Sequence, residues 1–335
     1  MYKRQPLTNI PKVWLDWYSA TFEKGLRDVP PATAQVAVLI QQIVRVAGSK
    51  NFNVRKIVEL MDDIIRFDPV TKLLMTGAGI FTINGVAEYA LPPMTVPVLG
   101  VSPNGKVVSA AVSMGKIKLR DIHRGQDLDC DILADSVMSC EGNIFGKSGD
   151  KLFQLIMMEP SGSFLTTTHL VGSISPNSTL MYDGVVFQDL LGAYYASLCP
   201  VSKTCYQIHF KELDGKRIVD AKYDSKVLIV VAFSKGKYDK FIFRINEDYN
   251  DYDCRVENDV GAATPNFIVM PGTGVVLHLN EKDELELFPN TIGSSRMKVF
   301  DDPMLTGDMR LMREGTQAMF SKGNHLYAFE VKKTP

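Results

Sequence analysis

The chain has 335 residues, 45% of them hydrophobic and 22% charged, which are the proportions of an ordinary globular protein. Its formal net charge of −1 gives no general electrostatic attraction to nucleic acid or to an anionic membrane. The five cysteines are too few and too scattered for a disulfide framework. We therefore expect reduced thiols in a cytoplasmic protein that binds neither nucleic acid nor a membrane.

The first five residues, Met-Tyr-Lys-Arg-Gln, resemble the translation, from a GTG start, of the end sequence used by a common sequencing-library transposase. We expect residues 1–5 to be an assembly scar, with the natural protein beginning upstream, and a genuine basic N-terminus is the alternative. A scar would indicate an uncultured microbial or viral source. In the viral case the expected location is the virion.

Residues 1–69 are predicted to form a helical N-terminal segment. Pro11 suits the first turn of a helix, and aromatic residues from Trp14 to Phe22 then recur at helical spacing. Pro30-Pro31 ends this helix, and an apolar second helix follows over about 32–47. A third helix is predicted from about residue 53 to Asp68-Pro69, with one apolar stripe made of Val54, Ile57, Val58, Met61, Ile64 and Ile65.

After Pro69 the hydrophobic period changes from 3.6 to 2, and short strands rich in Val, Ile, Phe, Tyr and Leu alternate with turn residues. A strand–turn–strand unit recurs through this region, most plainly over 97–122, 152–170, 226–245, 266–288 and 316–331. Such units bury their apolar faces only against neighbouring units. Residues 70–335 are therefore predicted to form a mainly β fold, a β-propeller.

The turns divide this region into seven segments, over about 71–95, 96–131, 135–182, 183–213, 216–258, 264–300 and 307–333. Seven blades are favoured and six longer blades are the alternative, with an open two-sheet sandwich as the rival architecture. A propeller closes by pairing strands from both chain ends in one blade, which protects the open edges. The strand near Leu73–Thr76 is predicted to complete the blade that ends at Tyr327–Val331.

The unit over residues 101–125 contains Ser-Pro-Asn-Gly-Lys, an apolar strand and then Lys-Ile-Lys-Leu-Arg-Asp-Ile. It resembles a blade of the WD-repeat family, in which a Trp-Asp pair ends the third strand. Arg120-Asp121 stands at that place, and the chain contains no Trp-Asp or Gly-His dipeptide. The resemblance implies a divergent WD-repeat-like propeller and, more loosely, a platform for protein assembly. It transfers no functional residues.

No intact catalytic or cofactor-binding motif is present, so we predict no catalytic residues and no cofactor. The candidate metal ligands are Asn246, Asp248, Asn250 and Glu257, which fall near the ligand positions of a calcium loop. The position that needs glycine for a sharp turn is Asp251, so a solvated loop is the alternative. None of the five histidines has metal-ligand spacing to another His or Cys.

Three functions remain open from the sequence. The first is a non-enzymatic protein-interaction or structural scaffold, whose protein partner binds the loops of one propeller face. The second is a propeller enzyme, a hydrolase or lyase, which needs His, Asp, Glu or Arg from several blades in the central channel. The third is a phage, virion or other assembly component that is held in place by its helical segment.

Overall fold

The computed structural model describes residues 17, 19–24, 49–90, 97–160, 163–198, 206–261 and 264–332. The chain divides into two units, 1–43 and 44–335. In the first, the described residues form one π-helical turn, η2 (Ser19–Glu23), and the helices expected over 10–29 and 32–47 otherwise lie outside the described residues. Among the described residues, no helix is long and apolar enough to cross a membrane.

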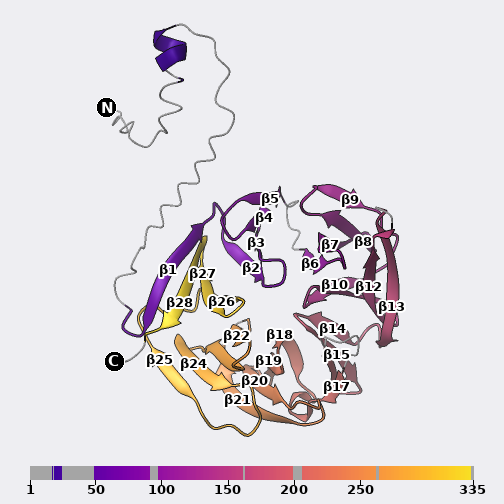
Figure 1. Ribbon diagram of the computed structural model, residues 1–335. Coiled ribbons are helices and arrows are strands. Elements are labelled where there is room, and N and C mark those ends of the chain that lie inside the picture. Colours follow the sequence, from indigo (N-terminus) through magenta and orange to yellow (C-terminus); the bar gives the residue numbers. More distant parts are fainter. Residues whose placement is uncertain are drawn as a thin grey trace. The chain divides into compact units, whose positions relative to one another are not determined.

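The described part of the second unit consists of seven antiparallel four-stranded sheets arranged as blades around a common centre (Figure 1). Each of the first four blades uses four consecutive strands, with the first strand innermost. Blade 1 contains β2 (Ile64–Asp68), β3 (Leu73–Thr76), β4 (Gly79–Thr82) and β5 (Ala87–Ala90). Blade 2 contains β6 (Val98–Val101), β7 (Val107–Ser113), β8 (Lys116–Asp121) and β9 (Gln126–Leu128). Blade 3 contains β10 (Ser136–Cys140), β11 (Asn143–Ser148), β12 (Lys151–Met158) and β13 (Leu165–Ser173). Blade 4 contains β14 (Thr179–Tyr182), β15 (Val185–Leu190), β16 (Ala193–Leu198) and β17 (Tyr206–His209).

The last three blades complete the ring, and a short 3₁₀ helix, η4 (Lys211–Leu213), lies between blades 4 and 5. Blade 5 contains β18 (Arg217–Asp224), β19 (Val227–Ser234), β20 (Lys237–Ile245) and β21 (Tyr252–Val260). Blade 6 contains β22 (Phe267–Met270), β23 (Val275–Leu279), β24 (Glu284–Pro289) and β25 (Lys298–Asp301). Blade 7 contains β26 (Met309–Glu314), β27 (Gln317–Lys322), β28 (His325–Val331) and β1 (Phe52–Glu59).

The sequence prediction of a seven-bladed β-propeller is confirmed, and so is the pairing of strands from the two chain ends in one blade. The closing strand differs from the expected one. β1 pairs with β28, in a register that places Phe52 opposite Val331 and Glu59 opposite His325. Leu73–Thr76 is instead the second strand of blade 1, so the propeller begins upstream of the boundary expected at residue 70.

The prediction of a third helix from residue 53 is wrong, because these residues form β1 and β2. The ladder between β1 and β28 shifts register between Lys56 and Val58, and the ladder between β2 and β3 shifts between Ile64 and Arg66. Each irregularity inserts a residue into the strand and breaks the alternation of apolar and polar positions. The resulting spacing of apolar residues imitates that of a helix.

Among the described residues, the hydrophobic core consists of seven separate clusters, one at each interface between neighbouring blades. Because a blade is covered on both faces, its inner strands become continuous apolar runs instead of alternating ones. In β19, Leu228 and Val230 belong to the cluster shared with blade 4, whereas Val227 and Ile229 belong to the cluster shared with blade 6. This packing explains why β19 reads Val-Leu-Ile-Val-Val-Ala, with all six side chains fully buried.

Candidate functional site

A cavity of about 1250 Å³ occupies the centre of the ring and is lined mainly by the innermost strands. Its charged and polar lining includes Arg66, Ser139, Asp183, Lys222, Asp224 and Arg313. These side chains come from blades 1, 3, 4, 5 and 7. The sequence alone could not reveal this convergence, because the residues are far apart along the chain and are brought together only by closure of the ring.

Two ion pairs join blades that are not neighbours. On β2 of blade 1, the Arg66 guanidinium lies 2.8 Å from the carboxylate of Asp183, which follows β14 of blade 4. On β26 of blade 7, Arg313 lies 3.1 Å from Asp224 at the end of β18 in blade 5. The paired side chains therefore extend across the cavity, and each charge is compensated by one from another blade.

Lys222 on β18 is a further cation in the lining of the cavity. Its Nζ donates a hydrogen bond of 2.7 Å to the backbone oxygen of Phe267. Burial lowers the pKa of Lys222, while the nearby carboxylates of Asp183 and Asp224 oppose that shift. A lysine in such surroundings is easier to deprotonate than one in water.

The ion pair of Arg66 is expected to contribute modestly to stability, because about a third of each partner remains exposed. Replacing Arg66 by Ala should lower the free energy of unfolding by about 1 kcal/mol. Replacing it by Lys should restore part of that loss, since a single charge remains without the planar guanidinium. Urea denaturation followed by far-ultraviolet circular dichroism measures the difference, and a loss above about 3 kcal/mol would contradict this assignment.

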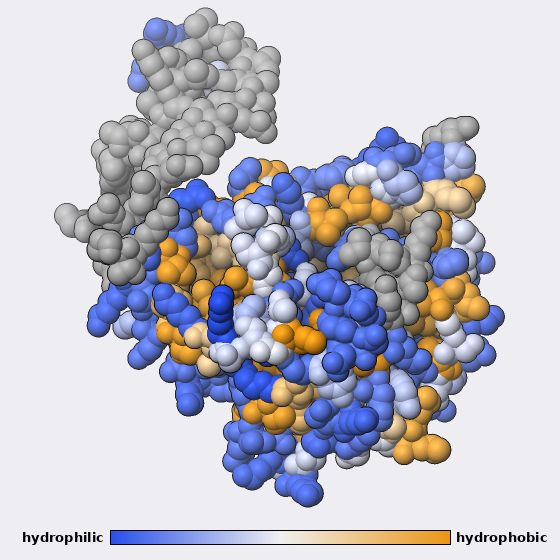
Figure 2. Space-filling model, turned by 60° about the horizontal axis from the view of Figure 1, so that its bottom comes forward, coloured by the Kyte–Doolittle hydropathy of each residue, from blue (hydrophilic) through white to orange (hydrophobic). Residues whose placement is uncertain are grey.

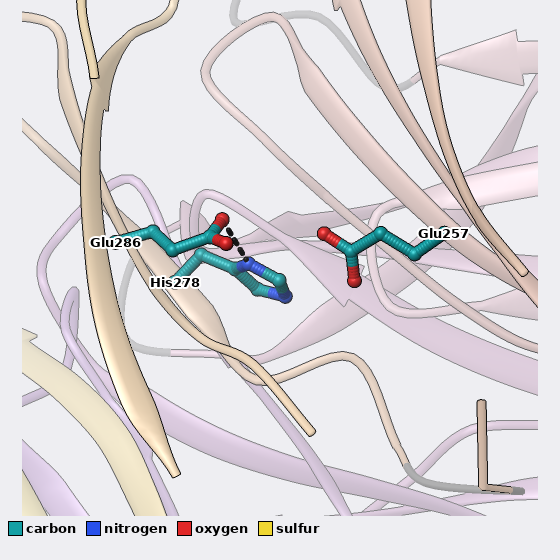
Figure 3. A group of neighbouring side chains, drawn as sticks. All are labelled: Glu257, His278 and Glu286. Carbon is teal, nitrogen blue, oxygen red and sulfur yellow. Dashed lines mark hydrogen bonds and ion pairs between the residues drawn. The ribbon is translucent and has the colours of Figure 1, made fainter. Parts of the chain in front are cut away.

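A second cluster of polar groups lies between blades 5 and 6. Among the described residues, Glu257, His278 and Glu286 form one group of side chains close enough together to hold a metal ion (Figure 3). Glu257 is on β21, His278 on β23 and Glu286 on β24. His278 is fully buried, and its Nδ1 lies 3.1 Å from a carboxylate oxygen of Glu286.

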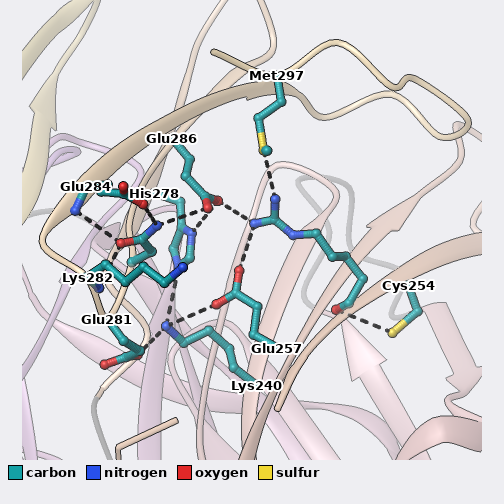
Figure 4. Close-up of polar contacts among 11 residues, drawn as sticks. Lys240, Cys254, Glu257, His278, Glu281, Lys282, Glu284, Glu286 and Met297 are labelled. Atoms are coloured by element: carbon teal, nitrogen blue, oxygen red, sulfur yellow. Dashed lines mark hydrogen bonds and ion pairs between the residues drawn. The ribbon is translucent and has the colours of Figure 1, made fainter. Parts of the chain in front are cut away.

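Two cations already compensate this cluster (Figure 4). Lys240 on β20 pairs with Glu281, and its Nζ lies 3.9 Å from Glu257 and 3.5 Å from His278 Nε2. Arg255 on β21 pairs with Glu286 and lies 3.0 Å from Glu257. A neutral His278 that donates from Nδ1 to Glu286 can accept at Nε2 from the Lys240 ammonium. The Lys240 ammonium thus lies next to His278 Nε2, the nitrogen that a metal ion would need as a ligand.

The predicted calcium-loop residues are separated by the fold. Asn246 follows β20, and its Oδ1 accepts hydrogen bonds from the backbone N–H groups of Asn250 and Asp251, at 3.0 and 3.2 Å. Asp248 is exposed in the same loop. Glu257 lies five residues beyond the start of β21, roughly 17 Å along an extended strand, and joins the His278 cluster instead. The structure therefore does not bring these four residues to one site.

Sequence reasoning missed the cluster around Lys240. The available signal was a lone polar residue inside an apolar strand, since His278 stands in Val-Val-Leu-His-Leu and Lys240 precedes Phe-Ile-Phe. A buried polar side chain needs a partner. The contacts of Lys240 with His278 and Glu281 cross from blade 5 to blade 6, so the local sequence could not reveal them.

Acid should weaken this cluster. Burial acts to raise the pKa of Glu286, but hydrogen bonds from His278 and Arg255 outweigh it and lower the pKa to about 2. Burial also lowers the pKa of His278 below its ordinary value of 6.5. In both cases the unfolded chain binds the proton at a higher pH than the folded protein does. The free energy of unfolding therefore falls as the pH decreases below about 6.5, and falls further between 4.5 and 2.

Denaturant midpoints measured from pH 7 to pH 3 test this expectation. In Glu286→Gln the decrease below pH 4.5 should be shallower than in the parent protein, because the carboxylate that resists protonation has gone. An identical pH profile for both proteins would show that Glu286 does not contribute to the acid sensitivity.

No protein-family model and no curated protein match the sequence. Among solved structures, the chain is similar to the β-propeller domain of Cps50 (Swd1) from Myceliophteria thermophila, with 12% identity and a TM-score of 0.45, covering 85% of this chain and 99% of that one. It is also similar to Kluyveromyces lactis Hsv2, with 9% identity, a TM-score of 0.43 and coverage of 81% and 98%. The WD40 domain of SCAP from fission yeast shows 8% identity, a TM-score of 0.39 and coverage of 83% and 98%. The seven four-stranded sheets by themselves confirm the expected propeller fold.

Proposed function

We propose that this protein is a non-enzymatic scaffold that binds protein partners through the loops and edges of its propeller. The observation that carries the proposal is that four charged groups of the central cavity form two ion pairs with one another. Arg66 is paired with Asp183 and Arg313 with Asp224, so these groups stabilise the ring. None of the five histidines lines the cavity. The proposal includes a cytoplasmic location and a protein partner.

Affinity capture of the tagged full-length chain from its native host tests this proposal. We expect one or a few specific proteins to be retained, with cross-links that map to propeller loops or outer strands. The matched variant Arg66→Lys should retain the same proteins, because the channel is not the binding surface. Failure to retain any specific protein would contradict the proposal.

One observation favours a second candidate, an enzyme with its site in the channel. Charged residues from several blades do converge there, as such an enzyme requires, and the lowered pKa of Lys222 suits a general base. Screening hydrolase and lyase substrates with the parent protein and with Lys222→Met distinguishes the two candidates. Turnover that is lost in Lys222→Met, with unchanged folding, would support the enzyme.

The third candidate, an assembly component, predicts that the protein sediments with particles. Density-gradient fractionation of host material, followed by immunodetection of the chain, tests it. Detection only among free proteins at the top of the gradient would contradict it.

A further inference from the structure

One outer edge of the propeller differs from the other six. The outermost strand of blade 3, β13, pairs with β12 on one side and lies on the rim of the ring (Figure 1). It has nine residues, Leu-Thr-Thr-Thr-His-Leu-Val-Gly-Ser, without Lys, Arg, Asp, Glu or Pro. Most of its side chains are exposed, including Leu165 and Leu170, which are 50% and 56% exposed.

The other outer strands are short or charged. Four of them, β5, β9, β17 and β25, contain only three or four residues each. The two long ones, β1 and β21, carry charged side chains along their length. Short length and charge are the usual means by which proteins protect sheet edges from pairing with other chains. Of the three long outer strands in the described chain, β13 alone lacks charged side chains and therefore this protection.

We propose that β13 pairs with β13 of a second copy of this chain, in an antiparallel arrangement that joins two blades into an eight-stranded sheet. This proposal rests on the proposed scaffold function and names a partner for one of its edges. Two copies related by a two-fold axis present the same surface to each other. Within the described residues only β12 pairs with β13, so the backbone N–H and C=O groups on its outer side would pair with those of the second copy.

The charge pattern favours a second copy as the occupant. In an antiparallel self-pairing, residues equally far from the axis face one another, so like charges in one strand tend to meet. On β21, for example, pairing centred on Val256 would place Asp253 opposite Asp259. β13 has no such conflict, and its threonines would form cross-strand pairs that stabilise a sheet.

The register follows from the regular part of the strand. β13 pairs regularly with β12 from Leu165 to Leu170, and a register shift follows between Leu152 and Phe153 of β12. Side chains that lie opposite one another in an antiparallel pair point to the same face of the sheet. The two-fold axis must therefore pass between two copies of the same residue, and not between one residue and its neighbour in sequence. The centre of the regular run makes that residue Thr167 or Thr168.

Figure 2 shows how apolar side chains are distributed on one face of the described residues. On that face, apolar side chains lie in scattered groups among hydrophilic ones. Association through β13 would rest on backbone hydrogen bonds with the flanking Leu165 and Leu170, and a small interface of this kind gives a concentration-dependent dimer.

Sedimentation equilibrium of the purified full-length chain over a hundredfold concentration range tests the proposal. We expect the mass to rise from 37.3 kDa toward twice that value. The variant Thr168→Lys places two ammonium groups near the axis and should remain monomeric, with an unchanged melting temperature. The matched control Val256→Lys on β21, where the side chain is 40% exposed, should dimerise as the parent does.

Cysteine cross-linking locates the axis. Under mild oxidation, Thr167→Cys or Thr168→Cys should give a disulfide-linked dimer, and Val256→Cys should not. A parent protein that stays monomeric throughout, or a dimer that Thr168→Lys leaves intact, would overturn the proposal while leaving the scaffold function open. A monomer that loses a captured foreign protein in Thr168→Lys would also overturn it, because the edge would then serve a different chain.

Discussion

Replacing Phe52 by Ala should lower the free energy of unfolding by about 3–5 kcal/mol, although this residue lies within the segment predicted to be helical, just before its third helix. Phe52 begins the closing strand β1 and is 2% exposed. Its ring packs against Phe300 of blade 6 and Phe329 of blade 7, with centroids 5.3 and 5.7 Å away. The substitution leaves a cavity at the point where the ring of blades closes.

The neighbouring residue supplies the control for this measurement. Asn53 lies on the same strand and makes an exposed hydrogen bond of 3.1 Å with Glu330. Asn53→Ala should change stability by less than about 0.5 kcal/mol. Circular dichroism is the suitable probe, because both tryptophans, Trp14 and Trp17, lie in the first unit of the chain. Equal stability of Phe52→Ala and Asn53→Ala would contradict closure through β1.

The propeller could be predicted from the sequence because its physical cause is local and repeated. Each blade needs short apolar strands and tight turns, so the period of 2 and the spacing of turn residues are visible without any knowledge of contacts. The blade observed over 98–128 lies within the predicted segment 96–131, and the blade over 267–301 ends one residue beyond the predicted segment 264–300. The closing strand β1 and the beginning of blade 1 were not predicted, because the irregularities near Lys56 and Ile64 disturb that period.

The candidate site was less predictable, because its residues are joined by the closure of the ring. Arg66 and Asp183 are 117 positions apart, and neither stands in a recognisable motif. The local sequence instead predicted a metal site in the loop that begins at Asn246, and the side chain of Asn246 accepts hydrogen bonds within that turn. Which residues lie close together in a propeller depends on the order of the blades around the ring. A single sequence indicates that order only through its repeated strand–turn–strand units.

Removing the ammonium group of Lys240 should lower the free energy of unfolding by about 3 kcal/mol. The side chain of Lys240 is 2% exposed, and Lys240→Met keeps most of its length while deleting the charge. Glu281 and Glu257 then lose their shared cation, and His278 Nε2 loses a donor. We expect the lower end of the range for a broken buried pair, because Glu281 and Glu257 are 30% and 22% exposed and can regain some hydration.

Two further variants separate this charge effect from loss of packing. Lys237→Met, on the same strand but 62% exposed, removes an exposed pair with Asp259 and should cost less than about 0.5 kcal/mol. In the Lys240→Met background, Glu281→Gln should restore part of the lost stability, because it neutralises a carboxylate that has no cation. A double-mutant cycle measures that coupling. If the two substitutions are simply additive, Lys240 stabilises the interface between blades 5 and 6 through its methylene chain, and its ion pair contributes nothing.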